Sequence, residues 1–476
     1  MVWLVVASLF FYGWWNPIYL PLLMLIAGFT YWVGARLSVA PSRWLLTLGI
    51  SVDLGALGYF KYAGFFVNNA AALAGTDWTI GTIILPLAIS FFTFQKIAYL
   101  IDSYEGLTKG YSLLEFILFV SFFPQLIAGP IVHYKEILPQ FRLPETFRLS
   151  AGNMAVGITI FAFGLFKKAV LADGIAVYAT PVFIAADAGA DPDFLTAWGG
   201  ALAYTFQLYF DFSGYSDMAI GAARMFGIVL PMNFNSPYKS LNIIDFWRRW
   251  HMTLSRFLRE YLYISLGGNR KGAARRYVNL FLTMLLGGLW HGAGWTFVFW
   301  GALHGVFLTI NHAWRRIVPE RIAAMRFYDS MAWLLTFTVV VLAWVPFRAQ
   351  TIDGAGRMLS GMFGLNGFSL PNAIIARLGG LRDVLDGIGV TANLGGGEAF
   401  TATWLWIPAL FILAAFAPNT QEIMGRMQPA LGFDAADTAR RLAWRPGPGW
   451  AAISGIAAAF GILALSQVSE FLYFQF

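Results

Sequence analysis

The chain has 476 residues, of which 58% are hydrophobic and only 12% are charged. Apolar runs recur from end to end, which indicates one polytopic membrane domain over residues 1–476 and excludes a soluble domain large enough to fold alone. The absence of cysteine excludes disulfides, thiolate metal sites and an acyl group carried on a cysteine, and the formal net charge of +7 is explained more simply by basic cytoplasmic loops than by nucleic-acid binding.

A chain of this length has room for about 10–12 membrane-spanning helices, so the predicted fold class is an all-α polytopic membrane protein. The first two spans form a hairpin that is interrupted at Trp14-Trp15-Asn16-Pro17. No internal repeat is visible. We expect spans near 2–14, 18–38, 43–62, 79–100, 112–130, 153–172, 195–222, 277–290, 294–311, 331–346, 402–417 and 449–467.

The charges of two connecting segments predict how the chain is oriented. Residues 185–193 carry three aspartates and no basic residue, so we expect them outside the cell. Residues 239–276 carry nine basic and two acidic residues, a net charge of +7, and we expect them in the cytoplasm. The span at 195–222 then crosses from outside to inside.

Two acidic residues lie near the end of that span. Asp211 and Asp217 belong to the stretch LYFDFSGYSDMAIGAARMFG, residues 208–227. A carboxylate inside a membrane is costly and is often functional. One or both could orient a histidine, cap a broken helix or bind substrate; the alternative is a helix end that is solvated at the interface.

Residues 244–268, IDFWRRWHMTLSRFLREYLYISLGG, predict an amphipathic helix at the cytoplasmic interface. Asn242 and Asp245 are candidate N-terminal caps. His251 lies one helical turn from Trp247 and Leu254, so we expect it to face the protein. The alternative role for His251 is a buried imidazole that is hydrogen-bonded to a carbonyl.

The stretch from Tyr277 to Ile310 contains 34 residues and no Asp, Glu, Lys or Arg. Its glycines around GGLWHGAG predict two helices with a break or close-packed bend beside His291. His291 lies roughly 21 Å along a straight helix from Tyr277, deep in the bilayer, where a titratable group is a candidate functional residue. The alternative is a histidine that only packs helices together.

The remaining histidines and the connectors carry less information. We interpret His304 and His312 as structural or interfacial and His133 as a loop residue. Residues 350–400 form a Gly-rich polar connector that could carry short amphipathic helices, and residues 418–448 form another polar connector. The spacing of histidines and the lack of cysteine predict no metal site, and the G-x-S-x-G, P-loop and dinucleotide patterns are absent.

Several long motifs together give the chain a resemblance to the membrane-bound O-acyltransferase superfamily, in particular to the branch of the bacterial alginate O-acetylation protein of the inner membrane. They occur in family order, with the core motifs within 121–310. They are SLFFYGWWNP (8–17), SFFPQLIAGPIVHYKEILPQF (121–141), DFSGYSDMAIGAARMFGI (211–228), NFNSPYKSLNIIDFWRRWHMTLSRFLREYLYISLGGNR (233–270), LGGLWHGAGWTFVFWGALHG (286–305), VPFRA (345–349), APNTQEIM (417–424) and FLYFQF (471–476). Relatives carry a longer segment before FFYGWW, so we expect an N-terminal helix of the family to be missing from this sequence, and the connector at 366–400 does not match the family.

The resemblance implies a multi-helix core with a central tunnel, plus interfacial and re-entrant helices. His291 corresponds to the family's near-invariant histidine, and His251 corresponds to a second family position that is often His or Asn. Both are therefore candidate catalytic residues. The candidate substrate-binding residues are Trp290, Asp211, Tyr215, Asp217, Asn235, Arg248 and Arg249.

The predicted reaction moves an acetyl group from a cytoplasmic thioester to a hydroxyl acceptor outside, for O-acetylation of an alginate-like exopolysaccharide or of the cell envelope. The expected donor is acetyl-coenzyme A or an acyl carrier, with no bound cofactor. A periplasmic acetyltransferase partner or the polysaccharide, together with membrane lipids, completes the expected partners in the bacterial inner membrane. D-alanyl transfer and lipid acylation remain alternatives, as does a transporter, although a transporter usually shows repeated halves.

Overall fold

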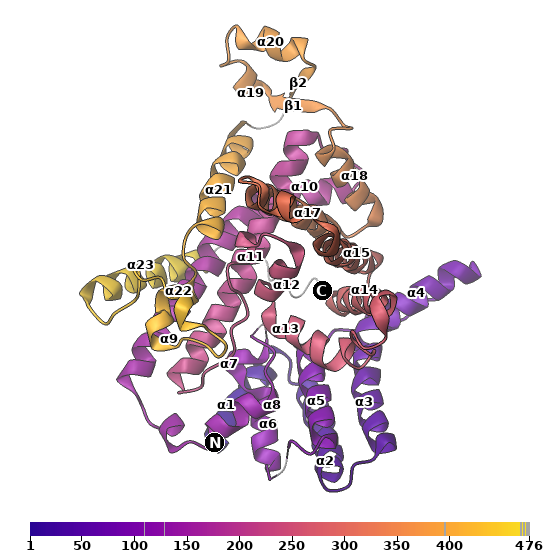
Figure 1. The fold of residues 1–476 in the computed structure, drawn as a ribbon, viewed down its shortest axis with the longest axis vertical. Helices are drawn as coiled ribbons and strands as arrows, with labels where there is room; N and C mark the ends of the chain where they lie inside the picture. Colours follow the sequence, from indigo (N-terminus) through magenta and orange to yellow (C-terminus); the bar gives the residue numbers. More distant parts are fainter. Residues whose placement is uncertain (109, 128, 395–396, 467–468, 470–471, 473–476) are drawn as a thin grey trace.

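The computed structural model describes residues 1–108, 110–127, 129–394, 397–466, 469 and 472 (Figure 1). Helices dominate this part of the chain, as the all-α class predicts. The helices of the N-terminal half are α1 Val2–Trp15, α2 Tyr19–Val39, α3 Arg43–Leu57, α4 Ala63–Ala74, α5 Ile89–Tyr104, α6 Leu113–Ser121, α7 Phe123–Leu126, α8 Tyr134–Phe141, α9 Ala151–Phe166, α10 Asp173–Asp187 and α11 Phe194–Met225. Two π-helical turns, η1 Gly58–Tyr62 and η3 Lys167–Ala172, join α3 to α4 and α9 to α10.

The C-terminal half is also mostly helical. Its elements are α12 Ile243–Arg249, α13 Met252–Phe257, the π-helical η5 Leu258–Tyr263, α14 Gly272–His291, α15 Trp295–Ile317, α16 Glu320–Ala323, α17 Tyr328–Arg348, α18 Ile352–Met362, β1 Phe368–Pro371, α19 Asn372–Ile375, α20 Leu381–Gly387, β2 Val390–Asn393, α21 Gly397–Ala415, α22 Thr420–Met424 and α23 Pro448–Ala464. Of the terminal motif at 471–476, only Leu472 lies within the described residues.

Helix α11 has 32 residues and lies in the middle of the molecule (Figure 1). It packs against α9, α10, α17, α18 and α21. Glycines allow the closest of these contacts, because a Cβ atom at Gly157 or Gly221 would lie 2.6 Å from a backbone oxygen of the facing helix. A helix is confirmed where the span at 195–222 was predicted, and it continues to Met225.

The structure corrects two predicted spans of the N-terminal half. The span predicted at 79–100 begins only with α5 at Ile89, because residues 77–86 have no helical structure. The span predicted at 112–130 is broken at Phe122, whose ψ of 106° leaves the helical region, so that it forms the separate helices α6 and α7. The predicted interruption at Asn16-Pro17 is confirmed between α1 and α2.

The single amphipathic helix predicted over 244–268 is wrong. The helix ends at Arg249, Trp250 is extended, and His251 takes a left-handed conformation with φ of +43° before α13 begins. The predicted burial of this segment is nevertheless correct, since Trp247, Leu254 and His251 are all buried. The predicted cap is confirmed too, because the Asn242 side chain accepts a hydrogen bond from the Asp245 N–H.

The connector at 350–400 contains a small sheet that the all-α prediction did not include. Strands β1 and β2 pair in parallel, with Phe368 opposite Val390, and helices α19 and α20 lie between them in the sequence. This lobe projects at the top of Figure 1. It is tied to the Asp-rich loop 185–193, since Asp193 accepts a hydrogen bond from Ser369 and Asp191 pairs with Arg357.

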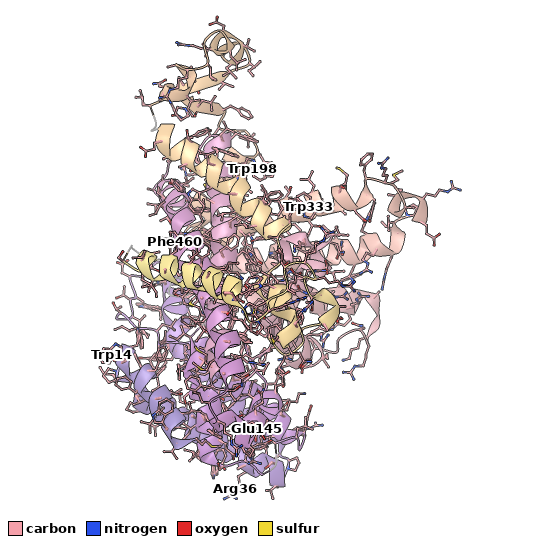
Figure 2. The ribbon with its side chains drawn as sticks, turned by 90° about the vertical axis from the view of Figure 1, so that its left-hand side faces the viewer. Trp14, Arg36, Glu145, Trp198, Trp333 and Phe460 are labelled. Carbon is pink, nitrogen blue, oxygen red and sulfur yellow. The ribbon has the colours of Figure 1, made fainter. Side chains whose placement is uncertain are left out.

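Four helical segments of the described residues are long and apolar enough to cross a membrane: 19–39, 151–187, 328–348 and 397–415. Helices α1 and α23 are apolar but shorter. Figure 2 shows Arg36 and Glu145 at the lower end of the molecule and Trp198 and Trp333 in its upper half. The chain is thus a polytopic helical membrane protein, while the count of 10–12 spans and their orientation stay predictions.

Candidate active site

The break predicted at GGLWHGAG is confirmed. Helix α14 ends at His291, and α15 begins at Trp295. The glycines before His291 serve close packing instead of breaking the helix, because a Cβ atom at Gly288 would lie 2.3 Å from the Phe297 carbonyl oxygen and 2.9 Å from Gly301 Cα. The backbones of α14 and α15 therefore touch directly beneath His291.

His291 is 7% exposed and lies in a box of aromatic rings. Its ring centroid is 5.1 Å from that of Trp300 and 5.2 Å from that of Phe347, both in edge contacts. Two cavities meet at this imidazole. One of about 230 Å³ is lined by Lys61, Ser90 and Trp290 among others, and one of about 10 Å³, the size of a single water molecule, is lined by Asp211.

His251 lies beside His291, with the two ring centroids 6.4 Å apart. Its Nδ1 is 3.1 Å from Asn233 Oδ1, and that oxygen also accepts the Thr253 hydroxyl at 2.8 Å. The Thr253 backbone N–H contacts the same oxygen at 3.4 Å, which fixes it as the acceptor. His251 Nδ1 must then donate, so that Nε2 of the neutral ring carries a lone pair. In the described residues this Nε2 is buried without a hydrogen-bond partner.

The Trp290 indole also lines the larger cavity. It stacks on Phe94 at 5.0 Å and meets Phe91 edge-on at 5.5 Å. Phe94 in turn stacks on Phe257 of α13. The Trp290 Nε1–H is buried and has no hydrogen-bond partner within the described residues, which leaves a donor available near the two histidines.

Asp211 lies within α11 and is 1% exposed, which excludes the solvated helix end considered for it. It forms an ion pair with Lys168 at 2.8 Å, and Lys168 also contacts Asp173 at 2.5 Å. Tyr215, one turn later, places its ring 5.7 Å from Lys168 Nζ. Asp211 is the member of this group that reaches a cavity shared with His291.

Three other candidate residues lie elsewhere. Asp217 is 5% exposed, pairs with Lys167 at 2.6 Å and accepts from Gln421. Asn235 donates its N–H to the Arg249 carbonyl oxygen, and Arg249 pairs with Asp245. The structure places none of these three in the cavities lined by His291.

A basic groove of about 550 Å³ lies between α12, α13, α14 and α15. Its titratable lining residues are Arg248, Arg256, Arg259, His312 and Glu136, and Glu136 forms an ion pair with Arg256 at 2.5 Å. Burial, followed by the charge of Arg276, lowers the pKa of His312 to about 4, so the arginines supply the positive charge at neutral pH. His312 lies beyond the predicted span 294–311.

One aromatic layer separates this groove from His291. Trp247 lines the groove, and its ring is 5.8 Å from that of Trp300, which contacts His291. Thr253 also lines the groove while it holds Asn233. The groove and the two histidines are therefore parts of one connected site.

The other two histidines lie outside the two cavities that His291 lines. His304 is fully buried and accepts a hydrogen bond from Trp247 Nε1. His133 lies in the loop before α8, as predicted, where it is the N-cap of that helix and only 1% exposed. Tyr261 lies 3.2 Å from its Nδ1, and burial lowers the pKa of His133 to about 4.

Sequence reasoning missed Lys61, Tyr62 and Asn233. Lys61 Nζ donates to the carbonyl oxygens of Trp290 and His291, and Asn233 orients His251. A signal for Lys61 was present, because it is a charged residue inside the span predicted at 43–62. Asn233 could not be recognised in the same way, because asparagine is common in loops and its presence there does not indicate a functional role.

Comparison with known proteins places this geometry in context. Residues 103–347 match the profile of the membrane-bound O-acyltransferase family, MBOAT. The chain is 48% identical over 402 residues to a peptidoglycan O-acetyltransferase of Helicobacter pylori, covering 78% of this chain and 75% of the relative. It is 46% identical to a probable alginate O-acetylase of Azotobacter vinelandii, covering 80% and 76%. It is 31% identical to a teichoic acid D-alanyltransferase of Streptococcus thermophilus, covering 56% and 69%.

Proposed function

The chain belongs to the membrane-bound O-acyltransferase family and is an acetyltransferase. From this premise we propose that it moves an acetyl group from a cytoplasmic thioester to a hydroxyl on the other side of the membrane. The proposed donor is acetyl-coenzyme A. The proposed acceptor is an alginate-like exopolysaccharide or the peptidoglycan of the cell envelope, reached directly or through a periplasmic acetyltransferase partner, with the enzyme in the bacterial inner membrane.

The observation that carries this proposal is the position of His291. It ends α14 where it lines two cavities, and aromatic rings pack against its imidazole. A hydroxyl with a pKa far above 7 is a poor nucleophile, and a neutral imidazole within reach can take its proton as it attacks. This fits His291 to the role of general base.

The reaction balances with the groups of this site. The acceptor hydroxyl gives its proton to the His291 imidazole while its oxygen bonds to the thioester carbonyl carbon. The tetrahedral oxyanion needs a donor, and we assign this role to the buried Trp290 Nε1–H, whose ring lies 4.9 Å from that of His291. When the intermediate collapses, the carbon–sulfur bond breaks, and the thiolate takes the proton back from His291.

His251 has a supporting role in this proposal. Because its Nδ1 donates to Asn233, its Nε2 can accept a hydrogen bond but cannot give one in the neutral ring. We therefore assign it to orienting the acceptor by accepting a hydrogen bond from a hydroxyl next to the one that His291 deprotonates, and not to the oxyanion. Asp211 shares a water-sized cavity with His291, through which its charge could stabilise the imidazolium.

The basic groove is the proposed entry of the donor. Its arginines suit the phosphates of coenzyme A, because guanidinium groups bind phosphate oxygens in pairs. In this proposal Arg248, Arg256 and Arg259 bind the phosphates of the donor. Arg249, paired with Asp245, and Asn235 would act only at the edge of the site.

The likeness to a teichoic acid D-alanyltransferase makes D-alanyl transfer the second candidate. Reconstituted vesicles distinguish these cases. The acceptor polysaccharide is trapped inside, and radiolabelled acetyl-coenzyme A or a D-alanyl carrier protein is added outside. Acetyl label on the trapped acceptor, with the coenzyme A moiety left outside, supports the proposal. If the trapped acceptor is labelled only from the D-alanyl carrier protein, the transferred group is D-alanyl instead of acetyl. Transport of an intact donor into the vesicle would overturn the enzyme mechanism.

A further inference from the structure

Two consecutive residues far from His291 in the sequence hold the end of its helix. Lys61 Nζ donates to the Trp290 carbonyl oxygen at 2.6 Å and to the His291 carbonyl oxygen at 3.0 Å. The Tyr62 hydroxyl donates to the Leu289 carbonyl oxygen at 2.8 Å. Three successive carbonyls at the end of α14 are thus held by one dipeptide.

The π-helical turn η1 makes this arrangement possible. Adjacent residues on an α-helix point in different directions and do not normally reach one target. Lys61 and Tyr62 are the last two residues of η1, where the wider turn re-aims the side chains, and such turns often mark functional sites.

The carbonyls that they hold lie in the last turn of α14. The last carbonyls of a helix lack partners within the helix. After His291 the chain leaves the helix at Gly292, whose N–H makes only a long bond of 3.4 Å to Gly288. Lys61 also lines the 230 Å³ cavity next to His291 and reaches Ser90 Oγ at 3.3 Å.

We propose that Lys61 and Tyr62 are positioning residues that fix the imidazole of His291 by clamping the carbonyls of Leu289, Trp290 and His291. This inference rests on the proposed function of His291 as the base. Neither residue needs to touch the reacting atoms. The clamp sets the direction in which the last turn of α14 presents its histidine to the cavity, and a displacement of about 1 Å costs about 10²-fold in rate.

The test compares Lys61→Met, Lys61→Arg and Tyr62→Phe with a matched control. Lys239 Nζ donates to the Ala417 carbonyl oxygen at 2.8 Å, just past the end of α21, and lies 3.6 Å from Glu422, so Lys239→Met removes a lysine–carbonyl contact, together with one ion pair, at a helix without a catalytic residue. Acetyl transfer gives kcat and the KM for the donor. Hydrogen–deuterium exchange of peptides covering 286–294 and 410–419 reports the two helix ends without any need for activity.

We expect Lys61→Met to lower kcat by about 10–100-fold while the donor KM changes less than about twofold. Lys61→Arg should restore most of the rate, since it keeps the donors. Exchange at 286–294 should quicken by about fivefold, as for a lost hydrogen bond, and exchange at 410–419 should change only in Lys239→Met. An unchanged kcat in Lys61→Met, or an equal loss in Lys239→Met, would overturn the proposal.

Two further outcomes have defined meanings. If Lys61→Met does not give a monodisperse protein, Tyr62→Phe decides, because it removes one hydroxyl only; a lower kcat at constant KM supports the clamp, and wild-type kcat overturns it. If the wild-type protein transfers no acyl group from any thioester, the proposed function fails, and exchange alone decides. Faster exchange confined to 286–294 then supports the clamp, and unchanged exchange refutes it.

Discussion

The ring centroids of His251 and His291 lie 6.4 Å apart, although one residue immediately precedes helix α13 and the other ends helix α14. Each histidine occupies a backbone break, one left-handed and one Gly-rich. Breaks free backbone groups, and at membrane depth such groups are tolerated only where they are buried in protein or line a cavity. The two histidines therefore mark the candidate active site within the helical core.

Replacing His291 by alanine should leave the protein folded and inserted but lower acetyl transfer by about 10²–10⁴-fold, the usual worth of a general base. His291→Gln keeps most of the volume between Trp300 and Phe347, so it separates lost packing from lost basicity. Radiolabelled acetyl transfer by purified protein measures the effect. Retention of more than a few per cent of activity by both variants would remove His291 from the role of base.

His251 and Asn233 should act as one unit. We expect His251→Ala and Asn233→Ala each to lower kcat by about tenfold, and the double variant to be no worse than the weaker single variant, because the amide acts through the imidazole. Melting temperatures of all three variants show whether lost stability contributes. Losses that multiply in the double variant would contradict the linkage.

Removing groove arginines should weaken donor binding without changing chemistry. For Arg248→Gln combined with Arg259→Gln, we expect the KM for acetyl-coenzyme A to rise by about tenfold at constant kcat, as for lost charge-assisted contacts. An acetyl thioester without phosphates should be used equally well by the variant and the wild type. Arg382→Gln, on the projecting lobe, is the control for a changed charge. Equal KM values for acetyl-coenzyme A would exclude the groove as the phosphate site.

The orientation can be tested by labelling, because the chain has no native cysteine. Ala188 and Ala274 are both exposed, one in the Asp-rich loop and one near the start of α14. A cysteine at 188 should react with an impermeant maleimide in intact cells, and a cysteine at 274 only after permeabilisation. The reverse pattern would place the basic groove on the side that lacks coenzyme A.

Composition and periodicity alone determined a large part of this protein. Apolar runs indicated the membrane class, Asn242 predicted the start of α12, and the glycines around His291 predicted the break between α14 and α15. These features depend on neighbours within one or two helical turns, where helix propensity, capping and the cost of a buried titratable group act. The amino-acid sequence by itself is therefore sufficient to identify His291 as a candidate functional residue.

Only the tertiary structure decided what surrounds His291. Periodicity predicted a continuous helix through His251, but packing against Asn233 and Phe212 holds that residue in a left-handed conformation. Lys61 reaches His291 across 230 residues. Such contacts arise because helices distant in sequence pack together and bury their polar groups against one another, which local pattern does not encode.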